Sequence, residues 1–394
     1  LHKEYRRQRQ MCIRDRVFAM IHRRHFSIAA GAAALGGFAA VARAQGDGPI
    51  LLGQSAPFTG PAAQLGIQFH QGAKVFLDAY NAQSGRRAVQ IKTLDDGYEP
   101  DRCAANTQKL IDEDVFALFG YIGTPTSLAA LPLAVKDKVP FVAPFTGAMA
   151  LREPFHKNVF HLRASYNDET ALMVRQLTHL GLKKIAVFHQ NDAYGKAGLD
   201  GVTLALAEQQ LKPIAQATVE RNSAEVAPAV KTLLAARPDA VVQVGAYKAC
   251  AAFIREARKA GFGGTFFNLS FVGTQALSDE LGKEAAGVLV TQVVPSPYSQ
   301  ANAIAREFTE AVRKAGNGAS ANFSSLEGYL AAKVLVEGLR KAPGKLSREG
   351  LITGLESIDR LQLGGFEVSF SAKNHVGSKF VELSMLTGDG KVRT

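Results

Sequence analysis

The chain has 394 residues, of which 47% are hydrophobic, so it can bury a large core and divide into two domains or lobes, and it is not intrinsically disordered. Its formal net charge of +11 would suit a nucleic-acid partner, but nine basic and only two acidic residues precede position 45. The other 37 basic and 33 acidic residues are spread along the chain, which argues against nucleic acid as a partner.

Residues 20–44 have the three regions of an export signal. The pair Arg23-Arg24 follows Met20, an apolar stretch rich in Ala and Gly covers residues 26–41, and Ala42-Arg43-Ala44 is a cleavage motif of small residues. We therefore predict export and cleavage after Ala44. The apolar stretch is shorter than the about 20 apolar residues of a membrane span, although an N-terminal anchor is the alternative. The arginine pair also resembles the twin-arginine pattern, so the general and the twin-arginine export routes both stay open.

Residues 1–19 are strongly basic, do not begin with Met, and precede a signal that has its own starting residue, Met20. We interpret them as an extension that is not part of the natural product. The N-terminal sequence of the secreted protein tests this interpretation and the cleavage site together.

After the signal, short β-branched or aromatic runs alternate with longer segments of helical period, which predicts the α/β class with mainly parallel sheets. A first series of strands is expected at residues 50–54, 89–94, 117–120 and 141–143. The helices between these strands are expected at residues 66–83, 102–114 and 127–136.

A second series begins near Tyr166 and repeats the same architecture. Its strands are expected at residues 184–189, 240–244, 265–268 and 287–292. Its helices are expected at residues 169–180, 196–210, 224–236 and 248–260. This repetition predicts two Rossmann-like lobes that pack across a cleft.

The sequence Pro295-Ser296-Pro297-Tyr298 interrupts the pattern and is expected to form a crossing strand between the lobes. Helices over residues 299–315 and 324–341 would then return to the first lobe, and the tail from Leu361 would cross again. We therefore expect lobes joined by crossing hinge strands. The N-terminal lobe is assigned residues 48–165 and 298–360, and the C-terminal lobe residues 166–297 and 361–394.

Ligands of open α/β sheets bind beyond the carboxyl ends of the strands. Three loops with polar and aromatic residues follow strands of the first series and should face a common cleft: Asp95 to Tyr98, Tyr121 to Ser127, and Pro144 to Ala148. Thr124 precedes a helix that Pro125 can begin, so its hydroxyl and nearby backbone N–H groups can receive a carboxylate. The alternative is that Thr124 only caps this helix.

An ordered set of motifs resembles the periplasmic leucine/isoleucine/valine-binding family over nearly all of the mature length. The motifs are Phe58-Thr59-Gly60-Pro61, Asp95-Asp96-Gly97, Tyr121 to Ser127, Pro144 to Ala148, Asn191-Asp192-Ala193-Tyr194-Gly195 and Gly245-Ala246-Tyr247. The resemblance implies a type I periplasmic binding protein, which closes two lobes around a small ligand and needs no cofactor.

The same resemblance implies roles for individual residues. Thr124 and the loop of Phe145, Thr146 and Gly147 would hold the α-carboxylate and ammonium of a ligand. Tyr194 and Tyr247 would close over the ligand from the second lobe, since a buried tyrosine provides contact area and one hydrogen-bonding tip. Alternatively, Tyr194 is a turn residue that packs on its own strand.

A departure from the family pattern at Ser270 bears on the ligand. Where amino-acid-binding members carry an acid to pair with the ammonium, our alignment places Ser270. Because a buried unpaired ammonium is costly, either another acid reaches the cleft or the ligand lacks this group. Glu327, near a helix start, is a candidate for that acid, and the alternative is a first-turn acid that complements the helix dipole.

The resemblance therefore implies a periplasmic, monomeric component of an ABC importer that binds an amino acid or a related small carboxylate or amide and contacts membrane permease subunits. An exported or regulatory ligand sensor of the same fold is the alternative. The sequence offers no Gly-x-Ser-x-Gly elbow, no G-x-G-x-x-G fingerprint between strand and helix, and no H-E-x-x-H motif, so an enzyme or a metal site is not expected.

Overall fold

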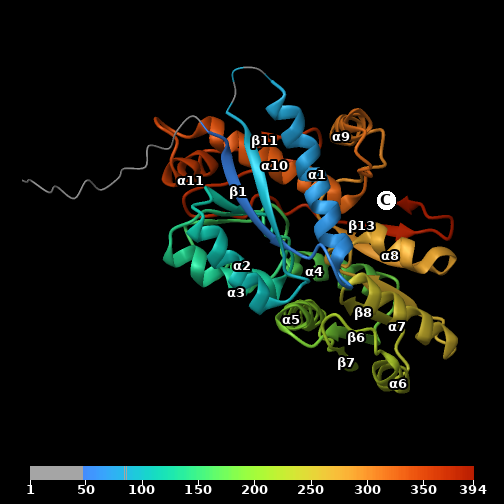
Figure 1. Ribbon diagram of the computed structural model, residues 1–394. Helices are drawn as coiled ribbons and strands as arrows, with labels where there is room; N and C mark the ends of the chain where they lie inside the picture. Colours follow the sequence, from blue (N-terminus) through green and yellow to red (C-terminus); the bar gives the residue numbers. More distant parts are fainter. Residues whose placement is uncertain (1–47, 84, 86) are drawn as a thin grey trace, which may run out of the picture. The chain divides into compact units, whose positions relative to one another are not determined.

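The computed structural model describes residues 48–83, 85 and 87–394 (Figure 1). The predicted extension at residues 1–19 and the export signal at residues 20–44 lie outside the described residues. All elements below belong to one unit of the chain, residues 47–394.

The first sheet has five parallel strands in the order β2-β1-β3-β4-β5. Almost every residue of the interior strand β1 is buried, as expected for a parallel strand with helices on both faces. In Figure 1, α1 lies on one side of β1, and α2 and α3 lie on the other. The bounds are β1 Ile50–Ala56, α1 Ala63–Asn81, β2 Val89–Asp95, α2 Pro100–Asp112, β3 Ala117–Phe119, α3 Thr124–Lys136, β4 Phe141–Val142 and β5 Val159–Phe160.

The second sheet has the order β14-β13-β10-β9-β8-β6-β7. Its five strands from β7 to β10 are parallel and follow the same order as the first sheet, with the second strand at the edge and the first beside it. The two final strands, β13 and β14, are added antiparallel. The strand bounds are β6 Ile185–Gln190, β7 Ala215–Val219, β8 Ala240–Val244, β9 Thr265–Asn268, β10 Leu289–Gln292, β13 Glu382–Leu386 and β14 Val392–Arg393.

The remaining elements cover the two sheets or connect them. The α-helices are α4 Tyr166–His179, α5 Ala193–Glu208, α6 Ala227–Ala235, α7 Tyr247–Lys259, α8 Thr274–Leu281, α9 Ala303–Ala315, α10 Phe323–Lys341 and α11 Arg348–Glu356. Short 3-10 turns lie at Met149–Leu151, Ser270–Val272 and Gly282–Ala285, and a small hairpin pairs β11 Leu361–Gln362 with β12 Glu367–Val368. The predicted α/β class with two similar lobes is confirmed.

Helices α1 and α10 approach at backbone distance. A Cβ atom added to Gly72 would lie 1.7 Å from the carbonyl oxygen of Ser325, and one added to Gly328 would lie 2.0 Å from that of Phe69. Only glycine fits at such contacts. These two glycines therefore hold α10, and with it Glu327, against the first lobe, although α10 follows the second lobe in sequence.

Two expectations about the connections need correction or refinement. Residues 295–298, expected as a crossing strand, form no strand; Ser299 N–H instead donates to the Ser296 carbonyl at 3.3 Å, and the prolines cannot donate to a ladder. The tail makes contacts with both lobes, since Gly377 N–H donates to the His161 carbonyl at 2.7 Å and only β13 and β14 join the second sheet. The assignment of residues to lobes remains our proposal.

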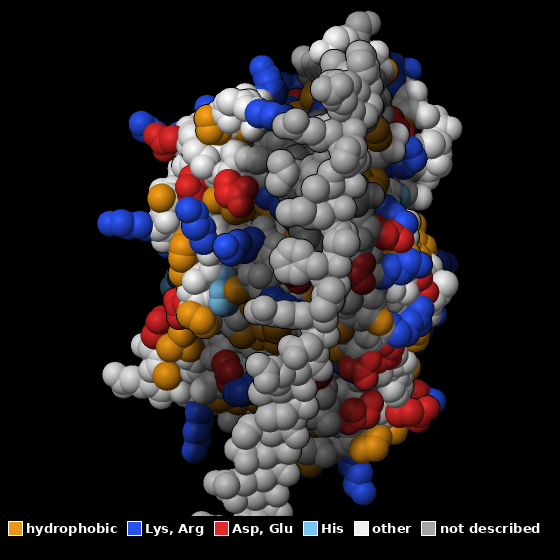
Figure 2. Space-filling model, turned by 60° about the vertical axis from the view of Figure 1, so that its left-hand side comes forward, with side chains coloured by type: hydrophobic (Ala, Val, Ile, Leu, Met, Phe, Trp, Pro, Cys, Tyr) orange, Lys and Arg blue, Asp and Glu red, His pale blue; other side chains and the backbone are white. Residues whose placement is uncertain are grey.

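On the face shown in Figure 2, the parts that are not grey carry both basic and acidic side chains on each flank. This distribution agrees with the even spread of charge along the sequence after residue 45.

Candidate ligand-binding site

The carboxyl ends of the strands of both sheets meet in one closed interface. Gln190, the last residue of β6, donates from Nε2 to the hydroxyl of Tyr98, which follows β2, at 3.3 Å. The Phe271 ring, after β9, lies 5.8 Å from the ring of Tyr98 and 5.8 Å from that of Phe145. These side chains are fully or almost fully buried, so the lobes are closed on one another here.

A polar latch of Glu99, Arg221 and Asn222 also joins the lobes. Glu99 follows β2, whereas Arg221 and Asn222 follow β7. The Glu99 carboxylate accepts from Arg221 Nη2 at 3.1 Å and from Asn222 Nδ2 at 2.7 Å. Asn222 also donates to the Gly97 carbonyl at 3.0 Å. The latch is half-exposed, so it can open without uncovering a buried charge.

Thr124 and Thr146 are fully buried, and their hydroxyl oxygens lie 2.7 Å apart. Thr124 is the first residue of α3, and the N-cap residue is Gly123, so the Thr124 hydroxyl does not cap this helix. Gly123 has φ +100°, and a Cβ there would lie 2.3 Å from the Tyr98 ring. A glycine before α3 therefore brings the hydroxyl pair, the positive end of the helix and Tyr98 together.

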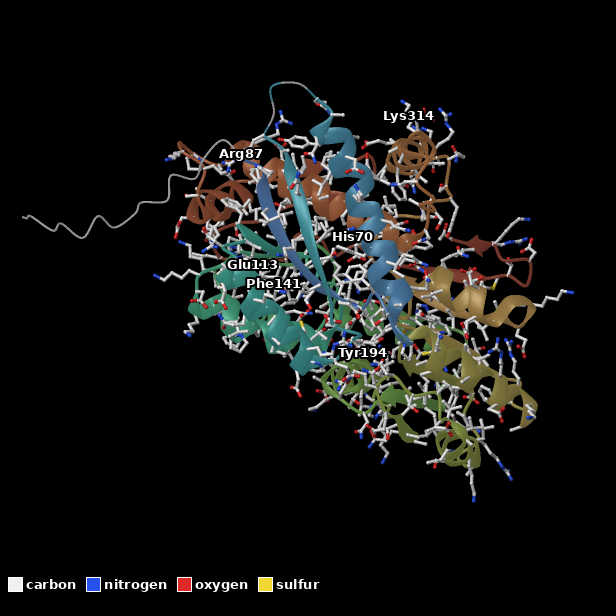
Figure 3. The ribbon with its side chains drawn as sticks, viewed as in Figure 1. His70, Arg87, Glu113, Phe141, Tyr194 and Lys314 are labelled. Carbon is white, nitrogen blue, oxygen red and sulfur yellow. The ribbon has the colours of Figure 1, made fainter. Side chains whose placement is uncertain are left out.

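Tyr166 lies beside Thr146 from the second lobe, and Tyr194 packs against Tyr166. We call Thr124, Thr146, Tyr166 and Tyr194 the hydroxyl cluster. The two rings are 5.4 Å apart, and Tyr166 N–H donates to the Gly147 carbonyl at 2.8 Å. The Tyr166 hydroxyl lies beside Thr146 and Gly147, but neither it nor the Tyr194 hydroxyl forms a hydrogen bond of normal geometry with any residue that the structure describes. Burial raises the pKa of Tyr166 to about 12 and also raises that of Tyr194, so both hydroxyls stay protonated and can donate. Figure 3 shows Tyr194 where α5 approaches the first lobe.

The other residues expected in the 145–147 loop and at Tyr247 have different surroundings. The Phe145 ring packs against Phe69 at 5.7 Å, and its backbone pairs with Tyr121 and Gly123. At Gly147 a Cβ would lie 2.5 Å from the Tyr166 ring, so only glycine allows this approach. Tyr247 begins α7, and its hydroxyl interacts with the backbone of Gln64 in α1 rather than with the hydroxyl cluster.

Ser270 and Glu327 are connected through Arg163, which the sequence analysis did not identify. Arg163 donates from Nε and Nη2 to the two carboxylate oxygens of Glu327 at 2.8 and 2.7 Å. Its Nη1 donates to Ser270 Oγ at 3.2 Å. Because the Glu327 carboxylate already forms an ion pair with the Arg163 guanidinium, Glu327 is not a free partner for a ligand ammonium.

Glu169, the other buried acid of this region, lies beside Ser270. Its carboxylate accepts from Ser270 N–H at 2.8 Å, from Ser270 Oγ at 3.0 Å and from the Thr291 hydroxyl. Burial raises the pKa of Glu169, although Arg163 and these donors lower it. A carboxylate can accept about four hydrogen bonds, so Glu169 retains the capacity for one more donor.

Arg163, Tyr166 and Glu169 were missed because they follow β5, a strand of only two residues. Had residues 159–160 been identified as the fifth strand, the polar run Arg163 to Glu169 would have occupied the same position as the other ligand-site loops. That position, beyond the carboxyl end of a parallel strand, was the available signal.

Other chemistry receives no support from the described residues. Within residues 48–394, apart from 84 and 86, no three His, Cys, Asp or Glu side chains are grouped to hold a metal ion. Cys103 and Cys250 are free, buried thiols. No helix in the same part of the chain is sufficiently long and apolar to cross a membrane.

Comparisons with known proteins agree with this architecture. A family model described as periplasmic binding protein matches residues 49–391. Leu/Ile/Val-binding protein homolog 7 of Brucella abortus is 24% identical over 392 residues, which cover 93% of this chain and 95% of that protein. The solved structure of a possible leucine/isoleucine/valine-binding protein from Rhodopirellula baltica is 35% identical with a TM-score of 0.85, and covers 88% of this chain and 96% of that one.

A substrate-binding periplasmic protein from Ralstonia solanacearum is 29% identical with a TM-score of 0.81, over 87% of this chain and 99% of its own. These relatives are solute-binding proteins and not enzymes. The chain therefore belongs to the periplasmic binding protein family, in its leucine/isoleucine/valine-binding type.

Proposed function

We propose that this protein is the periplasmic solute-binding component of an ABC importer, which captures an amino acid between its lobes and presents its closed form to membrane permease subunits. The observation that carries the proposal is the hydroxyl cluster at the facing strand ends. Buried hydroxyl groups from both lobes gather there, and among the described residues those of Tyr166 and Tyr194 have no hydrogen-bond partner of normal geometry. Buried polar groups are normally paired, so a polar ligand is the natural partner.

The first half of the cluster suits a carboxylate. Thr124 and Thr146 offer hydroxyl donors at the positive end of α3, and a carboxylate gains from both the dipole and charge-assisted hydrogen bonds. When the lobes open, the ligand would replace the direct contact between Tyr166 and the loop of Thr146 and Gly147.

Glu169, which lies outside the hydroxyl cluster, suits an ammonium. Glu169 takes the role that the sequence analysis considered for Glu327, because its carboxylate lies beside Ser270, where family members carry the acid. An amino acid would satisfy the carboxylate and ammonium positions together, whereas a simple carboxylate would leave Glu169 without its last donor. This chemistry favours an amino acid over a simple carboxylate, and an amino-acid amide would lose the charge at the α3 end.

The relatives do not restrict the side chain of the ligand. Names in the comparisons include a leucine-binding protein from Thermotoga maritima and a Rhodopseudomonas palustris protein in complex with benzoate, but at 22% and 20% identity they share only the fold. The aromatic rings of Tyr98, Phe271 and Tyr194 nevertheless predict that the side chain is apolar or aromatic rather than charged.

The test begins with mass spectrometry of the small molecules that co-purify with the secreted protein. Calorimetry then compares that amino acid with the carboxylate that lacks its ammonium and with its amide. We expect the amino acid to bind most tightly and Glu169→Gln to reduce this preference. Equal binding of all three would contradict the assigned ligand class. Uptake of the labelled ligand by cells without this gene separates an importer component from a sensor, because only loss of the importer abolishes uptake.

A further inference from the structure

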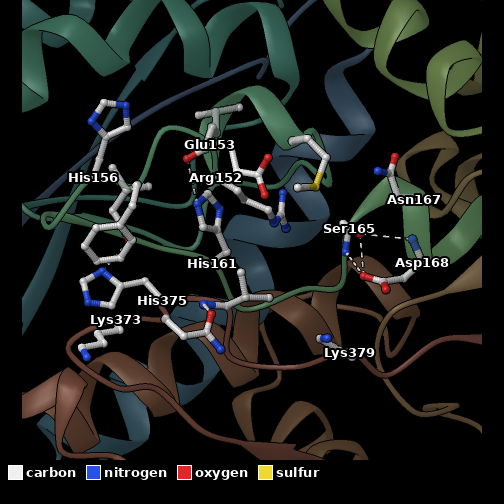
Figure 4. Close-up of a pocket in the computed structure, with 16 residues that line it drawn as sticks. Arg152, Glu153, His156, His161, Ser165, Asn167, Asp168, Lys373, His375 and Lys379 are labelled. Carbon is white, nitrogen blue, oxygen red and sulfur yellow. Dashed lines mark hydrogen bonds between the residues drawn. The ribbon is translucent and has the colours of Figure 1, made fainter.

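A cavity lies between residues 149–168 and the tail residues 373–379 (Figure 4). Its volume is about 490 Å³, and its lining includes Arg152, His161, Ser165, Asp168, Lys373 and Lys379. Figure 4 shows Arg152 and His161 close together in its wall, with Lys373 and Lys379 contributed by the tail. This cavity shares none of the residues of the hydroxyl cluster.

Arg152 carries a buried charge without a carboxylate in direct contact. Its Nη atoms donate to four carbonyl oxygens, those of Thr146, Ala148, Arg163 and Ala164, at 3.0 to 3.4 Å. Its Nε has no hydrogen-bond partner among the described residues. Asp168 and Glu169 act on Arg152 only from a distance, and a buried cation with no carboxylate in contact and one unpaired donor is costly, so an anion in the adjoining cavity would be stabilised.

His161 adds an acceptor beside this donor. Its side chain is almost fully buried, and burial together with Arg152 lowers its pKa well below the usual range, so the ring is neutral. Nε2 lies 3.1 Å from the Leu151 carbonyl and must carry the hydrogen, which leaves Nδ1 as an acceptor. Within the described part of the chain, Nδ1 has no donor.

The lining of the cavity holds three cations, Arg152, Lys373 and Lys379, and two carboxylates, Glu153 and Asp168. The side chains of Lys373 and Lys379 are exposed and form no ion pair with any residue that the structure describes. The nearby Asp168 carboxylate is occupied by the capping box of α4, where it accepts from Ser165 N–H at 2.9 Å and from Ser165 Oγ. The two lysines and the buried guanidinium thus outnumber the carboxylates that line the same space.

We propose that this cavity binds a small oxyanion that also carries a hydroxyl group, such as hydrogen phosphate or a hydroxycarboxylate. The anionic oxygens accept from Arg152 Nε and the rim lysines, and the hydroxyl donates to His161 Nδ1. A fully deprotonated oxyanion such as sulfate satisfies only the first set of contacts. This binding is independent of the ligand between the lobes and does not rest on the proposed function.

The test measures binding of inorganic phosphate and of sulfate to the secreted protein by calorimetry at pH 7 and constant ionic strength. We expect saturable phosphate binding and much weaker sulfate binding. The variant Lys373→Ala/Lys379→Ala should weaken phosphate binding by about fivefold to tenfold, the effect of two exposed charges. The matched control Lys183→Ala/Lys212→Ala removes two exposed lysines of the second lobe and should leave phosphate binding unchanged.

His161→Gln separates the acceptor from the fold, because the glutamine amide can still donate to the Leu151 carbonyl while Nδ1 is lost. We expect this variant to lose the preference for phosphate over sulfate. The proposal would be overturned if the unaltered protein showed no saturable phosphate binding or bound phosphate and sulfate equally. It would also be overturned if the control variant Lys183→Ala/Lys212→Ala weakened phosphate binding as much as Lys373→Ala/Lys379→Ala. Loss of phosphate binding in Thr124→Val would place the anion between the lobes instead.

Discussion

Arg163 and Glu327 form a bidentate ion pair in which Nε–Oε1 is 2.8 Å and Nη2–Oε2 is 2.7 Å, and their side chains are only 1% and 5% exposed. Arg163 also lies 3.9 Å above the centroid of the Phe145 ring and donates to Ser270. Burial alone would lower the pKa of Arg163, but Glu327 raises it above its usual value. One guanidinium thus joins α10 of the first lobe to the β9 loop of the second.

Breaking this ion pair should strongly destabilise the protein. Glu327→Gln leaves the Arg163 charge buried without a partner, so we expect the free energy of unfolding to fall by about 3–5 kcal/mol in urea denaturation. The control is Asp78→Asn, which breaks the exposed pair of Lys74 and Asp78 and should cost at most about 0.5 kcal/mol. A cost for Glu327→Gln no larger than that of the control would show that the pair contributes little.

The sequence predicted the fold well because strand and helix periods are local signals. The repeated order of strands follows from alternating segments that a single sequence displays. Arg163 and Glu327 could not be paired in this way, because 164 positions separate them and neither belongs to a local motif. Glu327 was expected near the ligand for its position at a helix start, and only the α1–α10 contact at Gly72 and Gly328 places it against Arg163.

Strands without an alternating apolar pattern were also missed. β5 has two residues, and β7 has the weakly apolar sequence Ala215-Gln-Ala-Thr-Val219 at the edge of its sheet. Such strands are fixed by pairing with a neighbour, which is tertiary information. The loops that follow them, with Arg163 and the latch residues Arg221 and Asn222, were therefore not placed at the interface.

Thr124→Val should weaken binding of the ligand between the lobes. The substitution keeps the shape of the side chain but removes a hydroxyl that would contact a carboxylate, so we expect a loss of about 1–3 kcal/mol in calorimetry. Thr203→Val is the matched control, since Thr203 is exposed on α5 and its hydroxyl donates only within its own helix. Equal affinities of Thr124→Val and the control would remove Thr124 from the site.

Ser270→Glu should damage the site rather than supply the acid that the family pattern lacks. The Ser270 N–H and hydroxyl both donate to Glu169, so a second carboxylate would lie against the first, and one of the two would have to be protonated. We expect weaker amino-acid binding and a lower melting temperature than for Ser270→Ala, which loses only the hydroxyl. Tighter amino-acid binding by Ser270→Glu would show that Glu169 is not the ammonium partner.

Removing the latch should open the lobes without affecting ligand contacts. Glu99→Ala loses the hydrogen bonds from Arg221 and Asn222, half-exposed contacts worth about 1 kcal/mol together, so ligand affinity should fall about fivefold as the closed population falls. Stopped-flow fluorescence should place the effect in faster release. Glu310→Ala, which breaks an exposed pair with Arg313, is the control and should leave the release rate unchanged. An unchanged release rate in Glu99→Ala would contradict the latch.

Asp95 and Asp96 are adjacent in sequence but should have opposite effects on the pH dependence of stability. Burial raises the pKa of Asp96 to about 6, although Ser55 and Tyr98 donate to its carboxylate. Burial also acts on Asp95, but hydrogen bonds from Thr59, Phe58 and Gly97 prevail and lower its pKa to about 2.

The folded state therefore binds the Asp96 proton more tightly than the unfolded chain does, in which the pKa is about 3.9. Asp96 therefore contributes stability below about pH 4, and this contribution is lost as the pH rises through about 6. Asp95 contributes stability above about pH 4, and this contribution is lost as the pH falls towards 2. Asp96→Asn should flatten the decline of unfolding free energy between pH 4 and 7 by up to about 3 kcal/mol. Asp95→Asn should instead reduce stability at pH 7 and leave that decline in place. Parallel curves for Asp96→Asn and the unaltered protein would show that Asp96 titrates alike in both states.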